Sequence, residues 1–285
     1  LKNKMSTVQT LLISFWLTFS FGVILATRLD IFPAVFTLLT LYLYTKGNTI
    51  WASCVLAIAV MFKAYPMVLA PLFMLDLFFK HKWRSLGSSL LGFSVSLLII
   101  SLPFYWLQPE NYLASFRYHA ARGIQLESLY ASYALLKHLF LAYPVQIQFI
   151  YGSADLLFSS APFLKTISTY LGLASFFAIY VRFCLIWRKE SYETNKELVM
   201  DSAILLVLAF MITFKVLSAQ FPIWLFPMIL LVGRHSRFWS LFLYACAVLL
   251  THLLYPIMLS SLFGLAPPTV ILVVFRNILL LALFM

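Results

Sequence analysis

Residues 8–26 of the chain read VQTLLISFWLTFSFGVILA, a run of 19 residues without a charged side chain. A helix of this length is about 28 Å long, which is close to the thickness of the hydrocarbon core of one bilayer. The apolarity is continuous and does not alternate along the run, so it predicts a membrane-spanning helix and excludes a β-barrel. Five further apolar runs with almost no charge follow, at residues 31–44, 87–104, 170–187, 198–214 and 238–254.

The composition of the chain supports the same fold class. Of its 285 residues 63% are hydrophobic and 10% are charged, whereas a soluble domain is typically about 45–50% apolar and about 25% charged. The net charge is +11, but the basic residues are dispersed among the predicted helices and short loops, which argues against nucleic-acid binding. Cys54, Cys184 and Cys246 stand in apolar runs without the spacing of a metal site. We therefore expect an all-α, polytopic membrane helix bundle with no nucleic-acid partner.

The basic residues also indicate how the helices are oriented, because Lys and Arg favour the cytoplasmic side of short loops. They stand at alternate ends of successive apolar runs, which predicts roughly ten crossings within a single domain at residues 1–285. Several of these crossings are short or flanked by proline, as is tolerated where a broken helix lines the protein interior or a polar cavity. The residues assigned to the cytoplasmic side are Lys2, Lys4, Lys46, Lys80, Lys82, Arg84, Arg188, Lys189, Lys196, Arg234 and Arg237.

A long segment at residues 105–164 interrupts this alternation of spans. Charged residues occur too often in it for a membrane span, so we expect short helices that lie at the outer interface. The chain opens with LKNKMSTVQT and ends within the apolar run LLLALFM. We therefore expect a fragment that lacks an N-terminal helix and a first outer loop.

The unusual polar residues gather on the predicted outer side. Three cations there, Arg28, Lys63 and Lys215, suit an anionic ligand in the membrane, such as a lipid phosphate or pyrophosphate. The alternative is that each cation extends separately to the lipid headgroups. The sequences concerned are TRLD at 27–30, FKAYP at 62–66, RYHAARGIQLESLYAS at 117–132 and FKVLSAQFP at 214–222. The candidate substrate-binding residues in them are Arg28, Lys63, Tyr65, His119, Arg122, Gln125, Lys215, Ser218 and Gln220.

Two acidic residues, Asp30 and Glu127, occur in the same sequences and are the candidate catalytic residues. Each has a simpler interpretation, Asp30 as an ion-pair partner of Arg28 and Glu127 as a surface partner of Arg122. His119 alone is typical of a polar residue at the interface. The sequence contains no zinc motif, glycine-rich phosphate loop or nucleophile elbow.

Four longer stretches resemble the GT-C membrane glycosyltransferases, specifically glycosyltransferase family 87. They are TRLDIFPAVFTLLTLYLYTKGN, AIAVMFKAYPMVLAP, YHAARGIQLESLYAS and FKVLSAQFPIWLFP. The resemblance implies an enzyme similar to polyprenol-phosphate-mannose-dependent α-mannosyltransferases. Such an enzyme moves mannose, or another hexose or pentose, from a polyprenyl-phosphate donor to a lipid or glycan acceptor. The resemblance also implies inversion, the extracytoplasmic face of a bacterial plasma membrane, and neither a cofactor nor a required metal.

In GT-C enzymes the presumed base is an acidic residue in the first outer loop, which belongs to the part expected to be missing here. An inverting transfer needs a base for the acceptor hydroxyl and cations for the departing phosphate. We expect Lys215 to contact that phosphate and Gln220 to bind sugar hydroxyls or a phosphate oxygen. The alternative is a lipid-linked-sugar transporter or flippase, which more often shows charges on both faces and an internal repeat. No such repeat is visible in the sequence.

Overall fold

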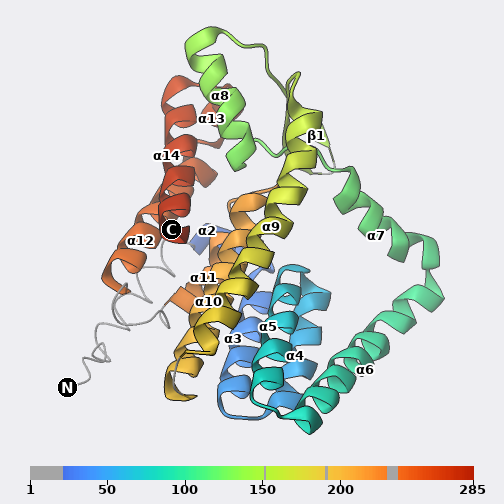
Figure 1. The fold of residues 1–285 in the computed structure, drawn as a ribbon. Coiled ribbons are helices and arrows are strands. Elements are labelled where there is room, and N and C mark those ends of the chain that lie inside the picture. Colours follow the sequence, from blue (N-terminus) through green and yellow to red (C-terminus); the bar gives the residue numbers. More distant parts are fainter. Residues whose placement is uncertain (1–21, 151, 190–191, 230–236) are drawn as a thin grey trace.

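The computed structural model describes residues 22–150, 152–189, 192–229 and 237–285. They fold almost entirely into helices, with one short β-hairpin (Figure 1). Most of the expected helix at residues 8–26 lies outside the described residues. In chain order the elements are α2 (Gly22–Thr27), α3 (Ile31–Thr45), α4 (Thr49–Phe62), η1 (Tyr65–Val68), α5 (Leu69–Phe79), α6 (Trp83–Leu107), α7 (Pro109–Ala121), α8 (Leu129–Leu141), β1 (Gln146–Ile150), β2 (Ser153–Leu157), α9 (Ala161–Trp187), α10 (Tyr192–Thr213), α11 (Pro222–Ile229), α12 (Arg237–His252), η2 (Leu253–Ile257), α13 (Leu259–Phe263) and α14 (Pro267–Phe284).

Four helices of the described chain are long and apolar enough to cross a membrane. They are Trp83–Leu107, Ala161–Trp187, Phe238–Ile257 and Pro267–Phe284. The mostly helical fold and these four helices agree with the expected membrane helix bundle. The apolar helices α3, α4 and the η1–α5 unit are shorter, at 10–17 residues, and the larger number of crossings stays a prediction.

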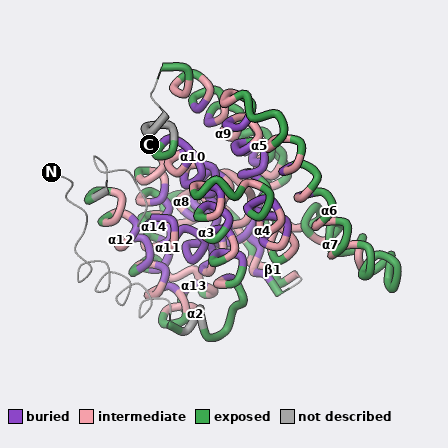
Figure 2. The backbone as a smooth tube through the Cα atoms, turned by 90° about the horizontal axis from the view of Figure 1, so that it is seen from below, coloured by how far each residue is buried: buried purple, intermediate pink, exposed green. Residues whose placement is uncertain are grey.

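The elements pack around two apolar cores. The larger core lies among α3, α4, α5, α10 and α11 and includes the fully buried Trp224. The smaller one joins α8 and β2 to α14 and η2. Buried residues are concentrated in α3, α4, α10 and α11, whereas α6 and α7 form a largely exposed arm (Figure 2).

Two breaks in the helices fall at the proline-containing stretches FKAYP and FKVLSAQFP, in agreement with the expected proline-flanked, broken helices. Helix α4 ends at Phe62, Lys63 is extended (φ −160°, ψ 138°), and the 3₁₀ turn η1 follows. Pro66 favours this break because it lacks an N–H group and restricts the residue before it. The segment at residues 214–221 similarly separates α10 from α11, which begins at Pro222, a residue suited to the first helical position.

Residues 105–164 differ in detail from the expected set of interfacial helices. Helix α6 continues through Pro103 to Leu107, and α9 already begins at Ala161. The short helices α7 and α8 lie between them, followed by the antiparallel hairpin β1–β2, in which Gly152 has φ +71°. The hairpin is not among the elements expected from the sequence, although a two-residue link containing glycine is a hairpin signal.

The cations assigned to the outer and cytoplasmic sides lie at opposite ends of the same helices. Helix α3 begins next to Asp30, which is paired with Lys63, and it ends next to Lys46. Helix α5 likewise leads away from the Lys63 break and ends next to Lys80. Lys2, Lys4, Arg234 and the side chain of Arg237 lie outside what the structure describes.

A buried polar network ties α14 to the start of α8. Arg276 is fully buried and donates from Nη1 to the Glu127 carboxylate at 3.2 Å and from Nη2 to the Glu127 carbonyl at 2.7 Å. Asn277 donates to the carbonyl oxygens of Glu127 and Ser128 and, at 2.8 Å, to Ser132 Oγ. The apolar helix α14 therefore carries Arg276 and Asn277 on the face that contacts α8.

We predict that Arg276→Leu destabilises the protein by about 3–5 kcal/mol, because it leaves the buried Glu127 carboxylate without its cation. The measurement is thermal unfolding of the purified protein in detergent micelles. Adding Glu127→Gln should recover part of the loss, since the unpaired buried charge is then removed. An unchanged unfolding temperature in Arg276→Leu would contradict a structural role for the pair.

Candidate functional site

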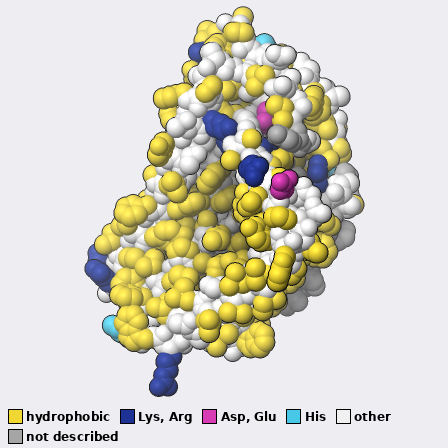
Figure 3. All heavy atoms as spheres, turned by 90° about the vertical axis from the view of Figure 1, so that its right-hand side faces the viewer, with side chains coloured by type: hydrophobic (Ala, Val, Ile, Leu, Met, Phe, Trp, Pro, Cys, Tyr) yellow, Lys and Arg dark blue, Asp and Glu magenta, His cyan; other side chains and the backbone are white. Residues whose placement is uncertain are grey.

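One large cavity, with a volume of about 1800 Å³, collects the polar breaks of the helices. Its walls come from α2, α4, α6 and α7, from residues 122–128, from the hairpin, and from residues 214–221. On the surface it is a hollow whose lower walls are apolar and whose upper part carries basic side chains with acidic ones beside them (Figure 3). The cavity is therefore amphipathic, with its charge gathered toward one end.

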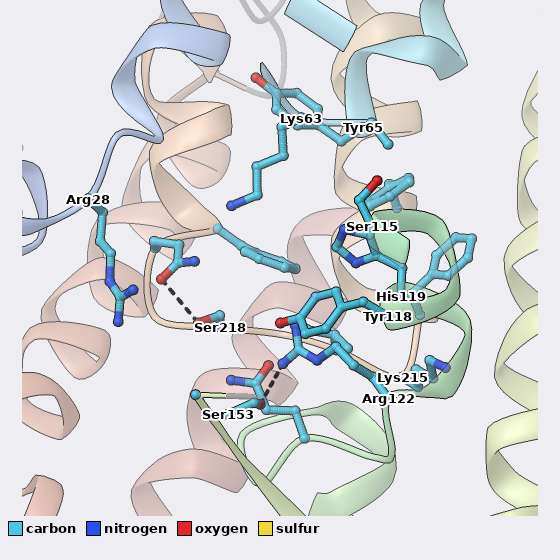
Figure 4. A pocket seen from close by; sticks show the side chains of 18 of the residues that line it. Arg28, Lys63, Tyr65, Ser115, Tyr118, His119, Arg122, Ser153, Lys215 and Ser218 are labelled. Atoms are coloured by element: carbon cyan, nitrogen blue, oxygen red, sulfur yellow. Dashed lines mark hydrogen bonds between the residues drawn. The ribbon is translucent and has the colours of Figure 1, made fainter. Parts of the chain in front are cut away.

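The structure brings nearly all of the sequence-predicted site residues to this cavity. Asp30 is the exception, since it is buried and does not line the cavity wall. Close up, Lys63, His119 and Arg122 come from different elements and point into the same space (Figure 4). The predicted residues that line the cavity are Arg28, Lys63, Tyr65, His119, Arg122, Gln125, Glu127, Lys215, Ser218 and Gln220.

Asp30 fixes Lys63 in place. Its Oδ1 atom accepts hydrogen bonds from Lys63 Nζ and from Trp224 Nε1, both at 2.7 Å. Trp224 stacks on Tyr65 with ring centroids 4.2 Å apart, and the Tyr65 hydroxyl lies 3.0 Å from Thr37 Oγ1. The carboxylate thus pairs with Lys63, and the expected pairing of Asp30 with Arg28 is not the one observed.

Two lysines hold the C-terminal end of α7. Lys215 Nζ donates to the carbonyl oxygen of Ala120 at 2.9 Å, and Lys165 Nζ donates to that of Ala121 at 3.2 Å. Cations are favourable at this end of a helix because the last carbonyl groups have no partner within the helix. Desolvation, and then the neighbouring Lys165 and Arg122, lower the pKa of Lys215 from its ordinary 10.5 to about 8.

Residues 122–128 present further polar groups to the cavity. Arg122 donates to Ser153 Oγ, while Asp155 accepts from the Gly123 N–H at 2.9 Å and from Ser153 Oγ at 3.2 Å. Arg122 Nε and Gln125 Oε1 are buried and find no hydrogen-bond partner among the described residues. A buried donor and a buried acceptor without partners are costly, so this wall suits a ligand that supplies both an acceptor and a hydroxyl.

His119 lies between the cations of the cavity (Figure 4). Burial, followed by Arg122, Lys63 and Lys215, lowers the pKa of His119 below its ordinary value of 6.5. The imidazole is therefore neutral at pH 7 and keeps one nitrogen able to accept a proton. Among the described residues, no group of three or more His, Cys, Asp or Glu side chains is placed to hold a metal ion.

The simpler interpretation of the sequence expected Glu127 to pair with Arg122. In the structure Glu127 pairs instead with Arg276 of α14.

Sequence reasoning missed further polar groups that lie at or beside the cavity. Arg276 carries a usable signal, because an ionisable residue inside an apolar helix usually has a structural or functional partner. Ser153 and Asp155 carry no such signal, since they reach the site through an unpredicted hairpin. The missed residues are Ser153, Asp155, Lys165, Arg276 and Asn277.

The chain was compared with protein families, with curated proteins and with solved structures. No family model, curated protein or solved structure matches it.

We predict that the cavity binds sulfate on the order of tenfold more weakly at pH 9 than at pH 7, because a charge-assisted contact is lost. Lys215 is charged below its pKa of about 8 and neutral above it, so its contribution is present at neutral pH and disappears on alkalinisation. Sulfate is a suitable probe because its own charge is constant over this range. The measurement is isothermal titration of the detergent-solubilised protein.

Lys215→Arg serves as the control, because arginine keeps its charge at pH 9. This variant should bind sulfate equally well at both pH values. A wild-type affinity that does not change between pH 7 and pH 9 would mean that Lys215 does not contact the anion.

Proposed function

We propose that the chain is a GT-C-type membrane glycosyltransferase, related to glycosyltransferase family 87, that uses a polyprenyl-phosphate sugar as donor. The observation that carries the proposal is the amphipathic cavity. Lys63, Arg122 and Lys215 offer cations to a phosphate, and apolar side chains of α4 and α6, such as Met61 and Phe104, continue from them. A molecule with an anionic head and a long apolar tail matches both parts.

The unpartnered polar atoms support a sugar phosphate over a simple lipid phosphate. Arg122 Nε lacks an acceptor and Gln125 Oε1 lacks a donor among the described residues. A phosphate oxygen satisfies the arginine, and a sugar hydroxyl satisfies the glutamine. Ser218 and Gln220, which are hydrogen-bonded to each other at 3.2 Å, extend the same wall with groups that bind hydroxyls.

The proposed reaction is an inverting transfer of mannose or a related hexose or pentose to a lipid or glycan acceptor. The acceptor hydroxyl oxygen forms a bond to the anomeric carbon, and the bond from that carbon to the phosphate oxygen breaks. A base takes the hydroxyl proton, and polyprenyl phosphate leaves with its charge stabilised by Lys63, Arg122 and Lys215.

The groups able to act as base differ in their availability. Asp30 is buried between Lys63 and Trp224 and does not line the cavity. Glu127 lines the cavity but is paired with Arg276. Neutral His119 has neither constraint, so it is the described cavity residue best suited to receive the proton.

The proposal also includes the number of membrane crossings and the side of the membrane on which the large cavity lies. We propose roughly ten crossings with broken helices in a bacterial plasma membrane, with the large cavity on the extracytoplasmic side. The placement of Lys46 and Lys80 at the helix ends opposite to Lys63 supports this orientation. A lipid-linked-sugar flippase is the alternative, and basic residues at both ends of the bundle favour it. Release of free polyprenyl phosphate during turnover distinguishes transfer from flipping.

We predict that Lys215→Ala lowers the rate of sugar transfer from a polyprenyl-phosphate donor by about 100-fold, or on the order of 3 kcal/mol. The loss arises because a cation that stabilises the leaving phosphate is removed. Lys215→Arg should be intermediate, since it keeps the charge but not the compact ammonium geometry. Turnover is measured with purified protein in detergent, and folding is checked by a monodisperse elution profile.

Lys137→Ala is a matched control, because Lys137 is a lysine of the same outer region that does not line the cavity. It should leave turnover unchanged. Wild-type turnover in Lys215→Ala would show that this lysine only caps α7.

The orientation is tested separately by labelling single cysteines from outside intact cells, in a background without the three native cysteines. A cysteine at Arg122 should be labelled and one at Lys82 should not. Lys82 follows α5 at the end where cytoplasmic lysines gather, and Arg122 faces the cavity. The reverse labelling pattern would invert the topology.

A further inference from the structure

A second, smaller pocket lies at the end of the helices opposite to the large cavity. It has a volume of about 150 Å³ and is enclosed by the α3–α4 turn, the α5–α6 turn and the first part of α10. This volume is several times the share of about 30 Å³ that one water occupies in the liquid. Four lysines from separate parts of the chain surround it: Lys46, Lys80, Lys82 and Lys196.

The acidic residue of the pocket, Asp76, is paired with one of these lysines. Asp76 is fully buried, and its Oδ2 atom accepts from Lys80 Nζ and from the Tyr44 hydroxyl, both at 2.6 Å. Its Oδ1 atom accepts from Trp187 Nε1 at 2.9 Å. Both oxygens are thus engaged, and among the described residues the cation paired with this carboxylate is Lys80.

Lys46 and Lys82 form no ion pair within the described part of the chain. Both are exposed, and both line the pocket. Thr49, at the start of α4, adds a hydroxyl to the same wall. The pocket therefore offers exposed ammonium donors and a hydroxyl to a small anion, an arrangement that suits a single phosphate group.

The surroundings of the pocket indicate a membrane surface. Trp83 begins the candidate span α6, and Trp187 ends the candidate span α9. Trp51, Phe78 and Trp83 are exposed near the same helix ends. Tryptophan and lysine at the ends of apolar helices are typical of the level of the lipid headgroups. The ends of α3 to α6 that form the pocket lie together at the bottom of the molecule in Figure 1.

We propose that this pocket binds the phosphate of an anionic membrane phospholipid, held by Lys46, Lys82 and Lys196 in the leaflet opposite to the large cavity. The chemistry alone also fits free phosphate. The lipid is favoured because the pocket lies at headgroup level, where the negative surface potential concentrates lysine-rich sites on anionic lipids. The site is independent of the proposed transfer reaction.

The test measures the binding of a fluorescent phosphatidylglycerol to the detergent-solubilised protein, with phosphatidylcholine and sodium phosphate as competitors. Lys46→Gln combined with Lys82→Gln should weaken binding about 25-fold, at about fivefold for each lysine near a membrane surface. Both residues are exposed, and thermal unfolding verifies that the double variant remains folded. Unlabelled phosphatidylglycerol should compete, whereas phosphatidylcholine should not.

The matched control is Arg84→Gln combined with Lys189→Gln, which removes two charges from the same end of the bundle but from outside the pocket. It should change the affinity by less than about twofold, because only bulk electrostatics is altered. Equally weakened binding in both double variants would show that diffuse surface charge binds the lipid and that the pocket does not. Equal competition by phosphatidylcholine would overturn anion recognition. Displacement of the fluorescent lipid by millimolar free phosphate would contradict a lipid site and would show that the pocket binds a soluble anion.

Discussion

The carboxylate of Asp30 is the constraint on which the cavity depends. A buried carboxylate must be matched by hydrogen-bond donors, and here both donors come from distant parts of the chain, Lys63 and Trp224. These contacts join the start of α3, the break after α4 and helix α11. They place the Lys63 ammonium at the cavity wall and set Trp224 against Tyr65. The helix break at FKAYP therefore faces the break at residues 214–221.

The breaks explain why charge gathers in a largely apolar protein. Irregular backbone in a membrane protein is tolerated where it lines a polar cavity, and three irregular segments here each carry a cation to that cavity. Lys63 follows α4, Arg122 follows α7 and Lys215 follows α10. Burial, and after it the repulsion between the neighbouring positive groups, lowers the pKa values of His119 and Lys215. An anion that binds among them relieves this repulsion.

Sequence patterns were sufficient for features that depend on neighbouring residues. The apolar runs predicted helices, and the prolines that flank them predicted broken helices, such as the one interrupted at Lys63. The long-range partners were not predictable in the same way, because nothing in the local sequence connects Asp30 with Trp224 or Glu127 with Arg276. The sequence suggested a nearby arginine as the partner of each acidic residue. In the structure each one pairs with a cation that is more distant in the sequence. The hairpin was missed because its two strands are short and each contains two polar residues among five.

Lys215 illustrates how a structural role and a binding role can reside in one side chain. Its ammonium group has three N–H donors, and the described contacts use one of them on the carbonyl oxygen of Ala120. Lys215 therefore caps α7 and still has N–H donors available for a ligand. An anion at the cavity surface can accept a second hydrogen bond while the first keeps α7 in place. The same anion raises the pKa of Lys215 by offsetting Lys165 and Arg122. Capping and anion binding then reinforce each other, because both depend on the same positive charge.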